Sequence, residues 1–359
     1  MSILRMGIIG YGGMAHWHQE RVRLVDGIEV VGVYDVLPAQ RQKGEADGYL
    51  AYPSRDALLA DERINCVLVA TPNHVHKENV IAALDAGKHV ICEKPVTLTV
   101  ADLDEMIAAS RRNEKLFTVH QNRRWDHDYL VAKEVFRSGA LGEVYTVQSC
   151  LSGTGGLING WRAFPEYGGG MVYDWGVHFL DQLLDMIPGR ILTVFADLHS
   201  VKNSLVDDYF HISLKFDSGL SVITELGTFM LRSKPRWYMA GNGGTMVINS
   251  FDGADGIITK VSKLAEAVEP VIVQTDAGPT RTFAPQPPET REDFPLPELI
   301  RDKTAFYRNV RDAIAGKENL IVRPEQVRRV LSLIEAVFVS AREGRSIPFE
   351  EKEIVWRES

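Results

Sequence analysis

The 359-residue sequence has only three cysteines, no internal repeat and no long hydrophobic run. Cys66 and Cys92 lie in strand-like apolar runs, and so few thiols predict buried free cysteines rather than a disulfide framework. No apolar run reaches about 18 residues, so we expect no membrane-spanning helix. The chain also lacks an excess of positive charge. Its formal net charge of −8 argues against nucleic acid or an anionic membrane surface as the main partner.

The N-terminal residues lack the pattern of a signal peptide, because Arg5 interrupts the first apolar run and glycines follow it. Together with the scarcity of cysteine, this predicts a cytoplasmic protein. A hydrophobic content of 45% and a charged content of 25% are typical of a globular chain. The length is too great for one ordinary core, so we expect two domains.

The first third begins with a glycine-rich turn between a strand and a helix. Residues 3–9 form a short apolar run, and Gly10-Tyr11-Gly12-Gly13-Met14-Ala15 opens a helical pattern that continues to about residue 25. In such a turn the first glycine permits the tight bend and the second lets the backbone approach a pyrophosphate. The small third residue lets helix and strand pack closely. The helix N-terminus attracts phosphates, so residues 10–14 predict a dinucleotide site.

An acidic residue follows at the expected distance. Asp35 ends a second strand over residues 28–34. A carboxylate at this place accepts hydrogen bonds from the adenosine ribose hydroxyls and repels a 2′-phosphate, so the sequence favours NAD over NADP. The alternative is a turn aspartate in an α/β domain that binds no cofactor.

Strands and helices then alternate to about residue 122: strands over 66–70, 89–92 and 116–120, and helices over 74–86 and 100–113. This alternation predicts a doubly wound parallel sheet, a Rossmann domain over residues 1–122. Functional groups gather at the carboxyl ends of such strands.

Two of these strand ends carry polar side chains. Thr71-Pro72-Asn73-His74-Val75-His76 has two histidines, but no cysteine or carboxylate stands close enough to complete a metal site, so we predict none. In Glu93-Lys94-Pro95 the lysine is placed to face the ligand crevice. A solvated surface lysine is the alternative.

Residues 123–359 follow a different pattern. Six strand-like runs succeed one another over 144–150, 191–201, 208–216, 220–229, 237–240 and 245–249, and Asp217-Ser218-Gly219 marks a hairpin. With helices over 129–137, 301–315 and 324–342, this predicts an α+β domain with a large, mostly antiparallel sheet. The last two helices are expected to be scaffold. Residues 251–297 are rich in Gly, Pro and acidic residues, and we predict an irregular insertion there, including an extended loop at 283–288.

The stretch Gly168–Asp181 carries the second candidate for chemistry. Three glycines lead into an apolar run in which Asp174 and His178 lie four residues apart. A helix would stack the two side chains on one face, and the carboxylate would then raise the pKa of the imidazole. A surface or capping contact is the alternative.

Taken together, the glycine turn, Ala70–His76, Glu93–Pro95 and Gly168–Asp181 resemble, in order and spacing, the motifs of the Gfo/Idh/MocA family of NAD(P)-dependent oxidoreductases. The resemblance covers essentially the whole chain. His120-Gln121-Asn122-Arg123-Arg124-Trp125-Asp126 is similar to the branch that contains scyllo-inositol dehydrogenases.

Two departures from this branch are visible. Its NADP-using members tend to carry Ser-Arg where this chain has Tyr34-Asp35, which agrees with a preference for NAD. Inositol dehydrogenases have a polar residue where this chain has Trp175, which puts an inositol substrate in doubt.

The resemblance implies site residues on both domains. The catalytic group would be Lys94, Asp174 and His178, and the Lys94–Pro95 bond would be cis. Cofactor contacts are expected, besides the glycine turn and Asp35, from Thr71, Pro72, Asn73, His76, Glu93, Lys94 and Asn122. Substrate contacts are expected from Lys94, Arg124, Trp161, Arg162, Trp175, His178 and Asp181. Guanidinium groups suit substrate oxygens, although structural ion pairs are equally compatible with these arginines.

The expected reaction is reversible oxidation of a secondary alcohol on a cyclic polyol or sugar, with His178 as base, Asp174 orienting its ring and Lys94 hydrogen-bonding the hydroxyl. Relatives pair their sheets between subunits, so we expect a homodimer or homotetramer. Two alternatives stay open: a glycosidase that oxidises its substrate transiently with bound NAD, and a regulatory protein that binds the dinucleotide without catalysis.

Overall fold

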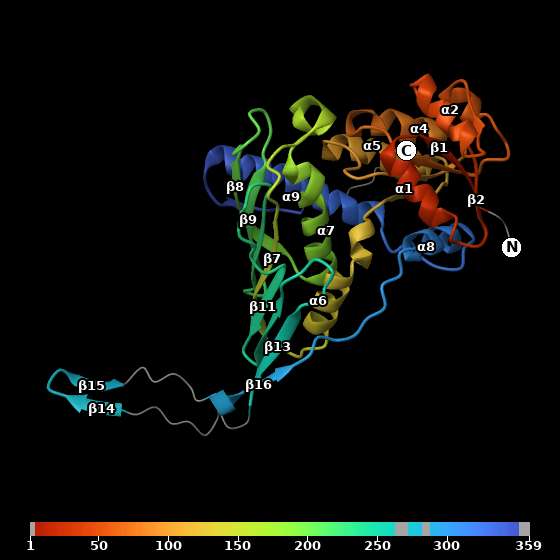
Figure 1. Cartoon of the computed structure of the whole chain (residues 1–359). Coiled ribbons are helices and arrows are strands. Elements are labelled where there is room, and N and C mark those ends of the chain that lie inside the picture. Colours follow the sequence, from red (N-terminus) through yellow and green to blue (C-terminus); the bar gives the residue numbers. More distant parts are fainter. Residues whose placement is uncertain (1–3, 263–271, 282–287, 352–359) are drawn as a thin grey trace.

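Two sheets organise the residues that this computed structural model describes, 4–262, 272–281 and 288–351 (Figure 1). The first is six-stranded with the order β3-β2-β1-β4-β5-β6, and every pair in it is parallel. Its strands are β1 Leu4–Ile9, β2 Ile28–Tyr34, β3 Leu50–Ala51, β4 Cys66–Val69, β5 His89–Cys92 and β6 Phe117–Val119. The surrounding helices are α1 Gly13–Val22, α2 Pro38–Ala46, α3 Arg55–Leu59, α4 His76–Asp85 and α5 Val100–Arg112.

This sheet confirms the predicted doubly wound parallel fold. Every residue of β4 is buried, as a strand must be when helices cover both faces of its sheet. The strand order reverses between β1 and its neighbours β2 and β4. Gly10 follows β1 there with a φ of 88°, and a Cβ added to it would lie 2.7 Å from the carbonyl oxygen of Ala70. Only glycine permits this approach, which opens a crevice at the switch point of the sheet.

The second sheet has nine strands in the order β16-β13-β12-β11-β7-β10-β9-β8-β17, and all pairs except β7–β10 are antiparallel. This confirms the mostly antiparallel α+β prediction. Its strands are β7 Val144–Ser152, β8 Ile191–His199, β9 Tyr209–Phe216, β10 Ser221–Gly227, β11 Trp237–Gly241, β12 Gly244–Ile248, β13 Gly256–Val261, β16 Arg291–Phe294 and β17 Ile347–Pro348.

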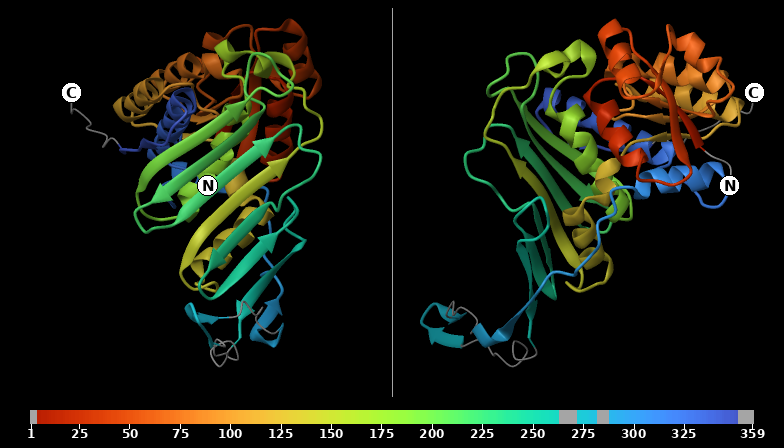
Figure 2. Two further views of the ribbon diagram at one scale, coloured as in Figure 1. Left: turned by 90° about the vertical axis from the view of Figure 1, so that its left-hand side faces the viewer. Right: turned by 45° about the vertical axis from the view of Figure 1, so that its right-hand side comes forward.

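Helices cover one face of this large sheet. They are α6 His127–Arg137, α7 Val177–Met186 and α9 Pro324–Glu343, and their buried apolar side chains form one core with those of the strands (Figure 1). Figure 2 shows the opposite face, over which no helix of the described residues lies.

The prediction of an irregular insertion over 251–297 is wrong for most of its described residues. β13 and β16 extend the large sheet, and β14 Ile272–Thr275 pairs with β15 Gly278–Arg281 in a hairpin that projects from the body (Figures 1 and 2). The β-branched residues of β13 suit a strand, and pairing with β12 satisfies its backbone. The expected loop at 283–288 lies outside the described residues, except for Pro288 at the start of a short 3₁₀ turn.

The C-terminal helices connect the two lobes. Phe306 and Tyr307 of α8 Ala305–Ile314 belong to the core of the first sheet. α9 contributes Leu331 to that core and Ile334 and Val337 to the core of the second sheet. Within the part of the chain that the structure describes, no helix is long and apolar enough to span a membrane.

Candidate active site

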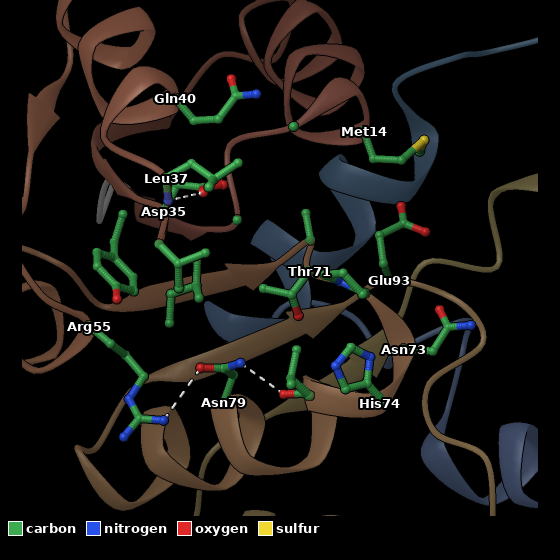
Figure 3. Close-up of a pocket in the computed structure, with 18 of the residues that line it drawn as sticks. Met14, Asp35, Leu37, Gln40, Arg55, Thr71, Asn73, His74, Asn79 and Glu93 are labelled. Carbon is green, nitrogen blue, oxygen red and sulfur yellow. Dashed lines mark hydrogen bonds between the residues drawn. The ribbon is translucent and has the colours of Figure 1, made fainter. Parts of the chain in front are cut away.

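A cavity of about 1020 Å³ lies at the carboxyl edge of the parallel sheet (Figure 3). It extends from the end of β2 across the glycine turn to the end of β5, where a segment of the second lobe closes it. Most predicted cofactor residues line it, together with two predicted substrate residues. They are Gly10, Gly12, Gly13, Met14, Asp35, Thr71, Pro72, Asn73, Glu93, Lys94, Trp161 and Arg162.

The middle of this cavity fits a pyrophosphate. A Cβ added to Gly12 or to Gly13 would meet nothing within 4 Å, so the backbone there is open to a ligand. Gly12 precedes α1 and offers no side-chain cap, which leaves the amides of the first helical turn available to an anion. The hydroxyl of Thr71 is buried without a hydrogen-bond partner. These unused donors are what a dinucleotide would satisfy.

Asp35 is fixed at one end of the cavity by the backbone. Its Oδ2 accepts a hydrogen bond from the Tyr11 amide at 2.7 Å and its Oδ1 from the Leu37 amide at 2.8 Å. The predicted cofactor residue Tyr11 does not line the cavity: its ring is buried and its hydroxyl donates to Asp47 at 2.6 Å.

Sequence reasoning missed two residues at this end. Arg55 and Asn79 also line the cavity, and an Arg55 Nη1 donates to Asn79 Oδ1 at 3.5 Å (Figure 3). The capping serine Ser54 marks a helix start directly after β3, at the same edge of the sheet, so this signal was present in the sequence.

At the other end, the structure brings together side chains from both lobes. Lys94 Nζ donates to Asp174 Oδ1 at 2.9 Å and to the Asp174 carbonyl oxygen at 2.8 Å. Arg162 Nε donates to the same carboxylate oxygen at 3.3 Å. Burial alone would raise the pKa of Asp174, but the charges of Lys94 and Arg162 outweigh it and lower that pKa. Asp174 is therefore an ionised anchor for two cations.

His178 does not pair with Asp174, so the predicted raised pKa is wrong. Val172–Gly176 forms a π-helical turn ahead of α7, and this turn breaks the stacking that a four-residue spacing gives in an α-helix. The Nδ1 of His178 is buried without a hydrogen-bond partner. Burial first, and then the charges of Lys94 and Arg123, hold the pKa of His178 well below its usual range. The imidazole is therefore neutral, and the protein leaves its Nδ1 unused.

Aromatic rings accompany these cations. The Arg123 guanidinium lies 4.1 Å from the centroid of the Trp175 ring, which makes a T-shaped contact with His178 at a centroid distance of 6.1 Å. Arg162 lies 4.4 Å from the Trp161 ring. Trp161 and Arg162 line the cavity, whereas the predicted substrate residue Trp175 does not and packs against Arg123 instead.

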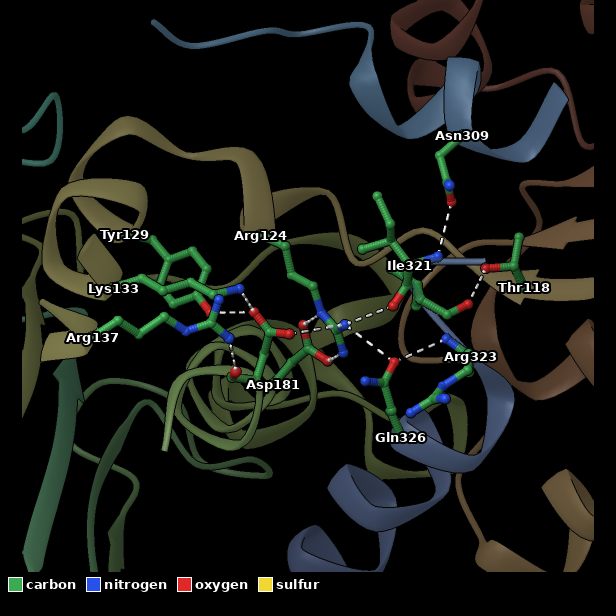
Figure 4. Close-up of polar contacts among 12 residues, drawn as sticks. Thr118, Arg124, Tyr129, Lys133, Arg137, Asp181, Asn309, Ile321, Arg323 and Gln326 are labelled. Atoms are coloured by element: carbon green, nitrogen blue, oxygen red, sulfur yellow. Dashed lines mark hydrogen bonds and ion pairs between the residues drawn. The ribbon is translucent and has the colours of Figure 1, made fainter. Parts of the chain in front are cut away.

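Arg124 and Asp181 meet each other rather than the cavity (Figure 4). Arg124 Nε donates to Oδ2 of Asp181 at 2.7 Å and its Nη2 to Oδ1 at 2.6 Å, with the residues 5% and 1% exposed. Asp185 and Gln326 extend this network on the Arg124 Nη1 side. Of the two interpretations that the sequence left open for Arg124, the geometry supports the structural ion pair.

Two further predicted cofactor residues lie outside the main cavity. His76 is buried, with Nε2 at 2.8 Å from the Thr71 carbonyl oxygen and Nδ1 at 3.0 Å from that of Pro95. It holds the Thr71 loop against the Lys94–Pro95 bond, which is cis as predicted. Asn122 lines a separate small pocket beside α1 and α8.

Glu93 is the centre of a hydrogen-bond network that no sequence motif predicts. Oε1 of Glu93 lies 2.6 Å from Nε2 of His18 and 2.8 Å from Nδ1 of His120, while Oε2 accepts a hydrogen bond from the Lys94 amide at 3.0 Å. The Tyr307 hydroxyl lies 2.8 Å from Nδ1 of His18. These residues are too far apart in the chain for spacing to reveal them.

The same three side chains, His18, Glu93 and His120, have the composition of a metal site. Ligand atoms bound to a metal at about 2.1 Å in tetrahedral or octahedral geometry lie about 3.0–3.4 Å apart. The observed 2.6 and 2.8 Å are shorter and match hydrogen bonds instead. The cluster is organised as a hydrogen-bonded carboxylate.

Family profiles and known proteins match most of the chain. The family profile described as "Oxidoreductase family, NAD-binding Rossmann fold" matches residues 4–121, and the "GFO/IDH/MocA C-terminal domain" matches residues 129–247. An uncharacterized oxidoreductase of Schizosaccharomyces pombe is 32% identical over 84% of this chain and 85% of its own. The scyllo-inositol 2-dehydrogenase (NADP(+)) of Bacillus subtilis is 26% identical over 98% and 97%. The crystal structure of an NAD-binding protein from Listeria innocua has a TM-score of 0.90 and 40% identity, covering 97% of this chain and 100% of that one.

Proposed function

Because the chain belongs to the Gfo/Idh/MocA family of oxidoreductases, we propose that it is an NAD-dependent dehydrogenase that oxidises, reversibly, a secondary alcohol of a cyclic polyol or sugar. The observation that carries the proposal is the contact of Lys94 with Asp174 at one end of a cavity whose middle is lined by the glycine turn. His178, buried with an unpartnered Nδ1, belongs to the same electrostatic cluster.

Groups of this chain would hold the pyrophosphate and the adenosine ribose of the dinucleotide. The amides at Gly12 and Gly13 would bind the pyrophosphate, and Asp35 would accept from the adenosine ribose. When bound, the nicotinamide ring supplies a hydride acceptor or donor. Asp35 also disfavours a 2′-phosphate, which supports NAD here, although the Bacillus subtilis relative is NADP-linked.

Each catalytic side chain has a separate task. The neutral His178 takes the proton of the substrate hydroxyl as the carbon is oxidised. Lys94 donates a hydrogen bond to the same oxygen and stabilises the negative charge that develops on it. Asp174 holds the Lys94 ammonium in place, which replaces the ring-orienting role expected from sequence.

The substrate class rests on two supports. The inositol relative acts on a ring hydroxyl, as its name states. The cavity wall near Lys94 contains the apolar ring of Trp161 beside the guanidinium of Arg162. A guanidinium can bind substrate oxygens. For the assembly, we propose a homodimer or homotetramer joined through the uncovered face of the large sheet. Light scattering on the purified protein tests this, and a monomer would contradict it.

The function is tested by incubating purified protein with NAD⁺ and a panel of inositols, aldoses and sugar acids, and following NADH formation. We expect net NADH with at least one of them. Release of a sugar from glycosides without net NADH would indicate the transient-oxidation alternative instead. Dinucleotide binding with neither outcome would indicate a regulatory protein.

The base is tested by His178→Ala, which should lower kcat by about 10²–10⁴-fold while NADH affinity is retained. His89→Ala is the matched control, since His89 begins β5 at the edge of the sheet opposite the cavity, where its Nδ1 accepts a hydrogen bond from the Leu116 amide at 3.0 Å. Because a lowered pKa keeps His178 neutral, kcat of the wild type should hold as the pH falls through about 6.5 and decline only below it. Wild-type turnover in His178→Ala would refute the assignment.

A further inference from the structure

Glu93 is a buried carboxylate in the wall of the cofactor cavity. Glu93 is 5% exposed, yet it lines the cavity directly after β5 (Figure 3). Lys94, the next residue in the chain, lines the cavity as well. A dinucleotide with its adenosine ribose at Asp35 and its phosphates at the glycine turn places its nicotinamide at the β5 end. Glu93 is thus a buried anion at the end of the cavity where the ring that is oxidised or reduced would lie.

The protein holds this carboxylate in its charged form. Two imidazoles, His18 and His120, contact one of its oxygens at 2.6 and 2.8 Å, and the Lys94 amide donates to the other. Burial alone would raise the pKa of Glu93, but the imidazole contacts reverse this and lower it well below its usual range. Burial lowers the pKa of His120 to about 4, so His120 is a neutral donor at physiological pH.

The donors are themselves fixed by the rest of the fold. Tyr307 of α8 lies with its hydroxyl 2.8 Å from Nδ1 of His18, on the side away from Glu93. With one ring nitrogen of His18 facing a hydroxyl and the other facing a carboxylate, the ring can donate to Glu93 without carrying a charge. The ammonium of Lys94, the next residue in the chain, is engaged by Asp174. The contacts of the Glu93 carboxylate are two imidazoles and one backbone amide, and among the described residues no lysine or arginine side chain is paired with it.

We propose that Glu93, clamped by His18 and His120, biases the bound cofactor electrostatically toward its oxidised form, NAD⁺. This rests on the proposed function, since it requires a nicotinamide dinucleotide in the cavity. The nicotinamide ring of NAD⁺ carries a positive charge, and reduction by hydride removes it. A fixed anion beside the ring stabilises NAD⁺ and leaves neutral NADH almost unaffected. At the effective dielectric of a protein, opposite charges a few Å apart change an equilibrium by more than tenfold. His18 and His120 are positioning residues in this arrangement.

The test compares the two cofactor affinities directly, without turnover. For the wild type and for Glu93→Gln, the Kd of NAD⁺ and the Kd of NADH are measured by calorimetry. We expect the ratio Kd(NADH)/Kd(NAD⁺) to fall at least about tenfold in Glu93→Gln, mainly through weaker NAD⁺ binding. An unchanged ratio in a folded Glu93→Gln protein would overturn the proposal. Glu20→Gln is the control, since the same substitution there removes an exposed carboxylate of α1 that does not line the cavity, so its ratio should equal that of the wild type.

A second measurement needs no variant. A dinucleotide whose pyridinium ring is replaced by a neutral benzamide ring keeps the shape of NAD⁺ and lacks its ring charge. The wild-type protein should bind NAD⁺ at least about tenfold more tightly than this analogue. Equal affinities would overturn the inference even if Glu93→Gln does not fold. A protein that binds neither NAD⁺ nor NADH would instead contradict the proposed function itself, so the two failures are distinguishable.

Discussion

The two ends of the cavity are built in different ways. At the Asp35 end, the carboxylate is held by amides of the same lobe, from Tyr11 and Leu37, and its position follows from a strand and two turns. At the Lys94 end, the ammonium comes from the first lobe and its partner Asp174 from the second, 80 residues later. A local motif thus builds the proposed cofactor end, whereas the proposed reactive groups depend on how the lobes are joined. Changes at the two ends should accordingly have different consequences.

The largest effect is expected from Lys94→Ala, which should lower kcat far more than it lowers the affinity for NADH. Loss of the ammonium removes the donor to the substrate oxygen, so we expect kcat to fall by about 10²–10⁴-fold. Affinity for NADH should change by only a few-fold, because the phosphate and ribose contacts lie elsewhere. Steady-state kinetics and calorimetry check both values. Lys77→Ala, which removes a lysine paired with Asp102 on the outer surface of α4, is the control. A loss of NADH affinity as large as the loss of kcat would contradict the division between the two ends.

The structural role of the buried ion pair between Arg124 and Asp181 is tested by Arg124→Ala. Removing one partner of a buried ion pair leaves the charge of Asp181 uncompensated, so we expect the free energy of unfolding to fall by about 3–5 kcal/mol. Denaturant titration measures this. Arg190→Ala, which breaks an exposed pair with Asp217, should change stability little.

The double variant Arg124→Ala/Asp181→Ala sharpens this result. It should be less destabilised than the sum of the two single variants, because the two residues interact directly. If Arg124→Ala were as stable as the wild type and lost substrate affinity instead, Arg124 would be a substrate ligand and the structural interpretation would be wrong.

The smallest effect is expected at the local end. In Asp35→Asn the negative charge near the ribose is lost while the side-chain oxygen can still accept a hydrogen bond from one amide. The preference for NAD over NADP, measured as the ratio of kcat/KM values, should fall about tenfold, with kcat for NAD almost unchanged. Asp217→Asn, in the hairpin turn after β9, is the control. A large loss of kcat would mean that the two ends are not independent.

The same contrast explains what the sequence could predict. The glycine turn and Asp35 follow from local spacing, so the parallel sheet and the cofactor crevice could be predicted from the residues. The meeting of Lys94 with Asp174 was expected only through family resemblance, because no local pattern relates residues so far apart. The pairing of Asp174 with His178 failed, since nothing in the apolar run indicated a π-helical turn.

Tertiary contacts account for the remaining differences. The clamp on Glu93 joins side chains of α1, of the segment after β6 and of α8, so only the folded chain reveals it. The strand β13 was missed for another reason. The glycines and acidic residues around β13 favoured an irregular segment in the sequence-based prediction, despite the β-branched residues of β13 itself. In the folded chain, pairing with β12 makes this segment a strand.

The helix α9 has one further consequence. Its Leu331 is anchored under the parallel sheet and its Val337, nearly two turns later, under the antiparallel one. Because α9 packs into both cores, it restricts the motion of one lobe relative to the other. The lobes can separate only if α9 bends or if its side chains leave one of the two cores. Entry of ligands into the cavity should therefore proceed by rearrangement of its rim, the loop that carries Trp161 and Arg162, rather than by a wide hinge motion of the whole molecule.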